Sequence, residues 1–93
     1  MLIKSDSHPV GGSIRWRVQY GRWIENTAYI LGTSTIESNN TAYGVGALTV
    51  EGKDLVFIVS GGALNQAVTL TVTMRDSLGN VLPDTINLIG VNP

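Results

Sequence analysis

Residues 68–74 read Val-Thr-Leu-Thr-Val-Thr-Met, so apolar and polar side chains alternate through the whole segment without a break. Because successive side chains of a strand point to opposite faces of a sheet, the alternation predicts a strand that is buried on one face only. The threonines form a ladder on the outward face, where β-branched side chains suit a pleated surface. The residues predicted to face the core are Val68, Leu70, Val72 and Met74. Each of them contributes about 1.5 to 3 kcal/mol when it is buried.

Two further segments carry clear strand patterns. Residues 14–20, Ile-Arg-Trp-Arg-Val-Gln-Tyr, alternate in the same way and predict a half-buried strand with Trp16 on its apolar face. Residues 55–59 instead form a continuous apolar run, which is too short for a helix and contains several β-branched residues. This run predicts a strand that needs cover on both faces.

The connection at residues 76–80, Asp-Ser-Leu-Gly-Asn, predicts a tight hairpin. Gly79 and Asn80 tolerate the positive φ that such a turn demands. Strands over residues 68–76 and 81–91 are therefore expected to pair antiparallel. Shorter strands are expected between glycine and asparagine punctuation, at residues 27–31, 34–38 and 47–50.

The number and spacing of these segments indicate the fold class. Seven short strands that recur about every ten residues most naturally form two packed sheets. Residues 1–13 show no periodicity and are expected to form an extended N-terminal arm. A chain of 93 residues, 43% hydrophobic and 14% charged, fits one globular core. The sequence therefore predicts an all-β protein, a β-sandwich of about seven strands in a single domain over residues 14–93.

Composition argues against several classes of partner. The net charge of -1 provides no dense set of basic residues, so nucleic acid is not an expected partner. No stretch reaches the roughly 18 apolar residues of a membrane span, and the first residues lack the basic and apolar regions of a secretory signal. A membrane is therefore not an expected partner either. Without cysteine, the chain has no disulfide framework and no thiolate metal site.

The sequence contains no recognisable catalytic or cofactor motif. His8 is the only histidine, whereas a metal shell needs several convergent ligands. Ser60 lies in a Ser-Gly-Gly sequence, outside any Gly-x-Ser-x-Gly motif and without a histidine to activate it. The acidic residues are scattered, so their spacing identifies no catalytic carboxylate pair. We expect no catalytic residue, no metal and no cofactor, and the protein is not expected to be an enzyme.

The order of the segments resembles a known family. The segments that carry the resemblance are the strand with Trp16, Gly-Arg-Trp-Ile at 21–24, Thr-Ile-Glu-Ser at 35–38, Ala-Leu-Thr-Val at 47–50, Val-Ser-Gly-Gly at 59–62 and the threonine-rich strand at 68–73. Over residues 14–91 the chain is similar to the immunoglobulin-like virion-associated module of tailed bacteriophages. The resemblance implies an immunoglobulin-like β-sandwich that serves as a decoration, fibre or accessory part of a virion, assembled in the host cytoplasm.

The apolar run contains a candidate contact surface. Leu55, Phe57 and Val59 are expected to face the core. Val56 and Ile58 then project from the opposite face of the sheet, where a free monomer would expose them. Two explanations stay open: a partner protein covers this pair, or the N-terminal arm, including Pro9, folds back over it.

Charge is unevenly distributed along the chain. Residues 1–24 carry a net charge of +3 and the remaining residues a net charge of -4. Arg15 and Arg17 lie on the outward face of the first alternating strand, so they could orient a complementary contact with another copy or with a capsid. A solvated strand face is the commoner explanation of the same charges.

Trp23 follows Gly21 and Arg22 and is either a core plug at a strand bend or an exposed contact residue. The leading hypothesis is a non-enzymatic structural protein of a tailed-phage virion. It would act as a capsid decoration or a head or tail accessory, bound to capsid or tail proteins and to copies of itself as a homo-oligomer. The alternative is a glycan-binding module for host-surface adsorption, with Trp23 displayed from a loop. The candidate partner-binding residues are Val56, Ile58, Arg15, Arg17, Pro9 and Trp23.

Overall fold

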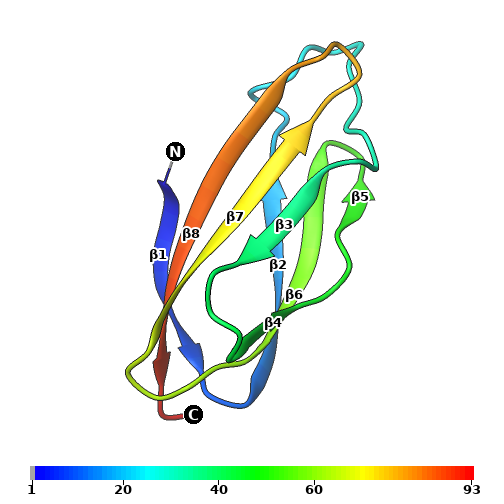
Figure 1. Cartoon of the computed structure of the whole chain (residues 1–93). Helices are drawn as coiled ribbons and strands as arrows, with labels where there is room; N and C mark the ends of the chain where they lie inside the picture. The colour runs from blue at the N-terminus through cyan, green and yellow to red at the C-terminus, as the bar shows by residue number, and fades with distance from the viewer. Residues whose placement is uncertain (1) are drawn as a thin grey trace.

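Eight strands in two sheets form the protein (Figure 1), and the computed structural model describes residues 2–93. The strands are β1 (Leu2–Pro9), β2 (Gly12–Gln19), β3 (Thr35–Ser38), β4 (Tyr43–Val45), β5 (Thr49–Glu51), β6 (Asp54–Gly61), β7 (Ala67–Arg75) and β8 (Val81–Val91). The predicted all-β sandwich is confirmed. Within residues 2–93, no helix is long and apolar enough to cross a membrane.

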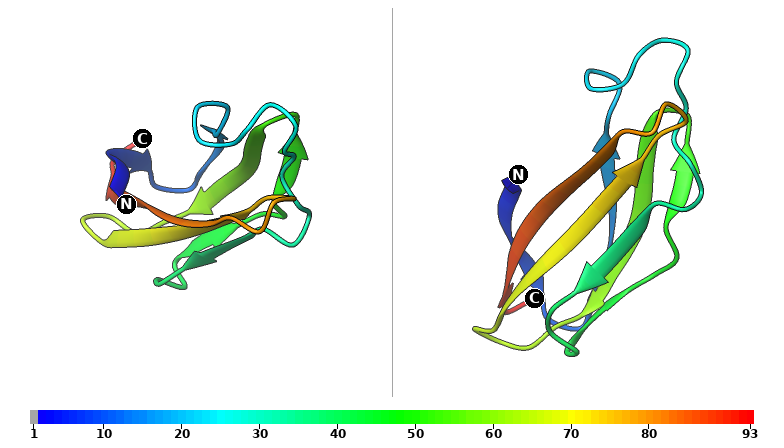
Figure 2. Two further views of the ribbon diagram at one scale, coloured as in Figure 1. Left: turned by 90° about the horizontal axis from the view of Figure 1, so that it is seen from above. Right: turned by 45° about the horizontal axis from the view of Figure 1, so that its top comes forward.

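The two sheets have different strand orders. The first sheet runs β1-β8-β7-β3, and the second runs β2-β6-β4, with β5 also paired to β6. The sheets lie face to face with the core between them (Figure 2). An immunoglobulin-like arrangement stays a prediction, and the topology is compatible with it. Immunoglobulin sandwiches place strands B and E in one sheet and C, F and G in the other. Here β2 and β6 share one sheet, and β3, β7 and β8 share the other.

Strands β7 and β6 supply the opposing walls of the core. Leu70, Val72 and Met74 of β7 are fully buried, as the alternation predicted, and Phe57 of β6 is almost so. Trp16 lies opposite Phe57 in the β2–β6 register and packs against the core while remaining partly exposed. The apolar faces of the two sheets therefore cover each other, which is the reason for a two-layer fold.

The hairpin between β7 and β8 forms as predicted, with antiparallel pairing along both strands and a positive φ at Gly79. Asn80 does not adopt the positive φ expected of it. Its backbone N–H instead donates to Asp76 Oδ1 at 2.8 Å, and its side-chain amide donates to Asp76 Oδ2 at 2.8 Å. The N–H of Leu78 also donates to Oδ1, at 2.9 Å. These bonds, that of the Asn80 side chain above all, lower the pKa of Asp76, so the carboxylate stays charged and organises the turn.

Three segments differ from the sequence-based expectation. Residues 2–9, which lie in the segment expected as an arm, form β1 and pair parallel with β8, so there are eight strands instead of about seven. Residues 43–45 form a short strand, β4, that was not expected. Residues 27–31, expected as a strand, belong to a loop in which Ile30 makes only an isolated bridge to Asp76.

Gly90 of β8 has no room for a side chain. A Cβ at this position would overlap the carbonyl oxygen of Ala63 and lie 2.9 Å from the hydroxyl oxygen of Tyr43. We predict that Gly90→Ala lowers the free energy of unfolding by about 3 kcal/mol or more, because backbone and a buried ring must both move. Urea denaturation followed by tryptophan fluorescence measures the change.

Gly46→Ala is the matched control for this substitution. A Cβ at Gly46 would lie 3.7 Å from the carbonyl oxygen of Ile58, which is an ordinary contact. Its effect on the free energy of unfolding should stay within about 0.5 kcal/mol. Equal stability of the two variants would contradict the close packing assigned to Gly90.

Candidate functional site

The predicted pair Val56 and Ile58 lies on the outer face of the second sheet, but only one member is exposed. Ile58 is 48% exposed, as predicted, whereas Val56 is 5% exposed, so the expected exposure of Val56 is wrong. Val56 has Arg17 and Thr49 as its cross-strand partners, and side chains of such partners lie side by side on the same face. Ile58 has Gly46 on one side, which leaves that flank open.

Arg15 and Arg17 are engaged within the chain. Arg15 Nη2 lies 2.9 Å from Glu51 Oε2, and Arg17 Nη2 lies 2.9 Å from Glu51 Oε1. Arg17 Nη1 also lies 2.7 Å from Asp54 Oδ2. Hydrogen bonding by Arg17, the largest cause, lowers the pKa of Glu51 and keeps it charged. The basic strand β2 and the acidic ends of β5 and β6 therefore neutralise each other, and a partner of these arginines would have to compete with Glu51 and Asp54.

Pro9 ends β1 and lies opposite Val91 in the parallel register with β8. It is half-buried. Proline has no backbone N–H, and it is tolerated there because β1 is an edge strand, in which not every backbone N–H has to bond to a neighbouring strand. Residues 2–9 of the expected arm are thus paired in the first sheet, and residues 12–13 already belong to β2 of the second sheet. The arm therefore does not fold back over Val56 and Ile58.

Trp23 is 60% exposed, so it is a surface residue and not a core plug. It follows β2 in the loop over residues 20–34, and its backbone N–H donates to the carbonyl oxygen of Tyr20 at 2.8 Å. The residues on either side of this turn, Tyr20 and Ile24, are buried. Because both ends of the turn are fixed in the core, the indole between them is held at the surface.

A second loop meets this one at the same end of the sandwich. The N–H of Tyr29 donates to Ser77 Oγ at 3.0 Å, and the N–H of Ser77 donates to the carbonyl oxygen of Tyr29 at 2.8 Å. The N–H of Leu31 donates to the carbonyl oxygen of Arg75 at 2.7 Å. These bonds fasten the 20–34 loop to the β7–β8 hairpin. The exposed large apolar side chains of the two loops and the start of β8, here called the loop-end surface, are Trp23, Tyr29, Leu78 and Val81.

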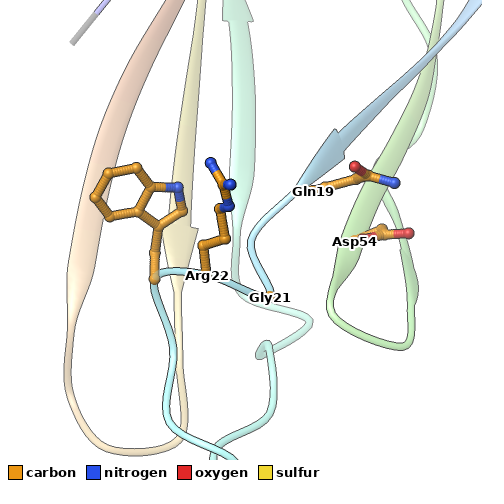
Figure 3. Close-up of a pocket in the computed structure, with 5 residues that line it drawn as sticks. Gln19, Gly21, Arg22 and Asp54 are labelled. Carbon is orange, nitrogen blue, oxygen red and sulfur yellow. The ribbon is translucent and has the colours of Figure 1, made fainter.

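Two recesses flank Trp23. The larger, of about 690 Å³, is lined by Trp23 together with Gln19, Gly21, Arg22 and Asp54. Figure 3 shows Arg22 on one side of this recess and Gln19 with Asp54 on the other. The smaller, of about 330 Å³, is lined by Trp23, Leu82, Pro83 and Asp84. Volumes of this size suit a small ligand or a side chain of a partner.

Tyr20 fixes the base of the loop. Its side chain is buried, and its hydroxyl donates to Asp84 Oδ2 at 3.1 Å. Burial, and secondly the nearby Asp84 carboxylate, raise the pKa of Tyr20 well above the ordinary tyrosine value of 10.0. Folding therefore favours the neutral, protonated form of the Tyr20 side chain.

The sequence had pointed to Trp23 but not to its neighbours. Gln19 and Arg22 lie near Trp23 in the chain but belong to no motif, and Asp54 is distant in the sequence. Only the β2–β6 register brings Asp54 next to Gln19. Within residues 2–93, no group of three or more His, Cys, Asp or Glu side chains is placed to hold a metal ion. Searches against protein-family models and curated protein sequences find no match for this chain.

We predict that Tyr20→Phe lowers the free energy of unfolding by about 1.5 to 3 kcal/mol, since it removes a buried hydrogen bond to the Asp84 carboxylate. Tyr29→Phe is the matched control, because Tyr29 is exposed, and it should change stability by less than about 0.5 kcal/mol. Urea denaturation of both variants gives the two values, and an equal loss in both would contradict the role assigned to the Tyr20 hydroxyl.

The raised pKa of Tyr20 also predicts a pH dependence. Above the ordinary tyrosine value of 10.0, the unfolded chain releases the phenolic proton and the folded chain retains it, so unfolding becomes more favourable as pH rises. Between about pH 10 and 11.5, stability should therefore fall more steeply for the unmodified protein than for Tyr20→Phe. Denaturation midpoints measured across this range test the difference, and parallel curves would exclude it.

Proposed function

We propose that the protein is a non-enzymatic structural component of a tailed-phage virion that recognises a target through its loop-end surface. The observation that carries the proposal is this surface itself, four exposed large apolar side chains on two fastened loops and the adjoining start of β8. The virion setting rests on the resemblance over residues 14–91. The two-sheet fold is the architecture that this resemblance implies.

The physical properties of the loop-end surface suit binding. Exposed aromatic side chains provide a large contact area with few rotatable bonds, and loops rich in Tyr, Ser, Gly and Asn resemble those of antibody paratopes. The 20–34 loop and the 76–80 turn have this composition. Because hydrogen bonds already hold the two loops together, little ordering entropy is lost when a target binds.

Attachment to the virion is assigned to a different surface. The outer face of the second sheet presents Ile58 beside Gly46, away from the loop end. A capsid or tail protein, or a second copy of the chain, would bury this side chain. Around Ile58, the contact would include the buried Val56 and the arginines Arg15 and Arg17, whose charges are neutralised by Glu51. The protein would then be a decoration or accessory protein that leaves its loops free to meet a target.

Two variants test this division of roles. Tyr29→Ala combined with Leu78→Ser removes two exposed contacts of the loop-end surface, and Ile58→Asp places a charge on the sheet face. We predict that the first variant binds host cells at least tenfold more weakly and still co-sediments with particles of the phage that encodes the protein. Ile58→Asp should show the reverse.

Circular dichroism spectra matching the unmodified protein would establish that both variants fold. If the unmodified protein bound neither cells nor particles, the proposed function would be wrong. If Ile58→Asp abolished cell binding and the loop variant retained it, recognition would belong to the sheet face.

A further inference from the structure

The second sheet ends on one side at β2, which pairs with β6 and with no other strand in the described part of the chain. The N–H of Tyr20 donates to the carbonyl oxygen of Lys53 at 2.9 Å, one position beyond the last pair of the β2–β6 register. Because backbone bonds alternate along an antiparallel pair, every second residue of β2 directs its N–H and C=O toward β6, and the others direct theirs away from it. The residues whose backbone groups point to the free edge are Ser13, Arg15, Arg17 and Gln19, and within residues 2–93 these groups have no hydrogen-bond partner.

The other edge strands of residues 2–93 are short or carry features that discourage pairing. β1 is as long as β2, but Lys4 and Asp6 lie on its core side, opposite buried residues of β8, and it ends at Pro9. Charges that point inward and prolines are devices that keep an edge strand from pairing with another chain. β3 has four residues, and β4 and β5 have three each. The free edge of β2, with eight residues, is thus the one that is both long and without such a device.

The core side of β2 is apolar and incompletely covered. Ile14 lies opposite the fully buried Val59 in the β2–β6 register, so it is on the core face, yet it is 41% exposed. Trp16, opposite Phe57, is also partly exposed, and Lys4 Nζ lies 5.8 Å from the centroid of its ring. An apolar side chain that faces the core and is still exposed marks a place where a further strand would bury additional apolar surface.

The arginines of β2 leave its free edge open. Arg15 and Arg17 both bind Glu51 at 2.9 Å, and Glu51 belongs to β5, which lies on the other side of β6 from β2. These ion pairs draw the two guanidinium groups across β6 and away from the free edge. Glu51 and Asp54 also balance the two positive charges, so no net charge on this face repels a second copy.

We infer that β2 is a self-association edge, at which β2 of one protomer pairs antiparallel with β2 of a second copy and joins their second sheets into one. An unpaired ladder of backbone N–H and C=O groups recognises another extended strand. A second copy supplies a strand of equal length, and a two-fold axis between the copies makes the pairing antiparallel. The apolar core sides of the two strands then adjoin, so Ile14 of each copy is covered by core-facing side chains of the other. The inference goes beyond the proposed function and does not rest on it.

A charge on the core side of the edge tests the inference. Sedimentation equilibrium of the unmodified protein should give about twice the 9.9 kDa mass of one chain. Ile14→Lys should raise the dissociation constant of the dimer at least tenfold, because it places a cation beside the partner strand, as Lys4 does on β1. Ile58→Lys is the matched control, since Ile58 is similarly exposed but lies on the outer face of the central strand β6. It should leave the dissociation constant unchanged.

Ser13→Pro tests the backbone ladder itself. The N–H of Ser13 points to the free edge, so proline removes one donor to the partner strand and none of the bonds to β6. This variant should also weaken the dimer at least tenfold, whereas Ser13→Ala, which retains the N–H, should not change it. Circular dichroism spectra that match the unmodified protein would show that all four variants fold.

Three results would overturn the inference: a monomer at every concentration, equal weakening by Ile14→Lys and Ile58→Lys, or equal weakening by Ser13→Pro and Ser13→Ala. If the protein were a monomer and Ile14→Lys abolished particle binding, the edge would pair with a strand of another protein, and the second copy would be wrong. If the dimer responded to the variants as expected but the protein bound neither cells nor particles, the edge would stand and the proposed function would be wrong.

Discussion

The hairpin of β7 and β8 is the element on which the remaining structure depends. It forms the middle of the first sheet, with β1 paired on one side and β3 on the other, and its apolar face is one wall of the core. The buried Asp76 carboxylate closes its turn by accepting three hydrogen bonds. Because Ser77 of the same turn holds Tyr29, the position of the 20–34 loop is also set by this hairpin.

The exposure of Trp23 is a consequence of how that loop is fixed. Tyr20, Ile24, Ala28 and Ile30 are buried along the loop. Each buried side chain anchors the backbone, so the residues between the anchors must point outward. Buried anchors restrict the motion of an irregular loop, and less motion lowers the ordering cost when such a loop binds a partner.

The sequence predicted the long strands that carry an apolar pattern, either alternating or continuous, and it missed β1 and β4, which carry none. β7 alternates apolar and threonine residues, and its bounds were close to the prediction. β1 lies at the edge of the first sheet, where charged side chains are tolerated, and it carries Lys4, Asp6 and His8 at alternate positions. His8 is nevertheless buried, with Nε2 3.1 Å from the carbonyl oxygen of Gly12 and its ring edge-on to Tyr43. His8 is thus buried through a hydrogen bond and a ring contact, and β1 shows no alternation of apolar and polar residues from which a strand could be predicted.

The candidate site shows the same limit. A run of apolar residues indicated that Val56 would be on the outer face. Its cover by Arg17 depends on the register between β2 and β6, which also pairs Arg17 with Asp54, 37 residues later in the chain. That register also cancels most of the charge asymmetry seen in the sequence, since the arginines of β2 meet Glu51 and Asp54 within one molecule. Arg22 lies just beyond the paired part of β2 and escapes this cancellation. Within residues 2–93, Arg22 therefore keeps a guanidinium outside these ion pairs, next in the chain to the exposed indole of Trp23.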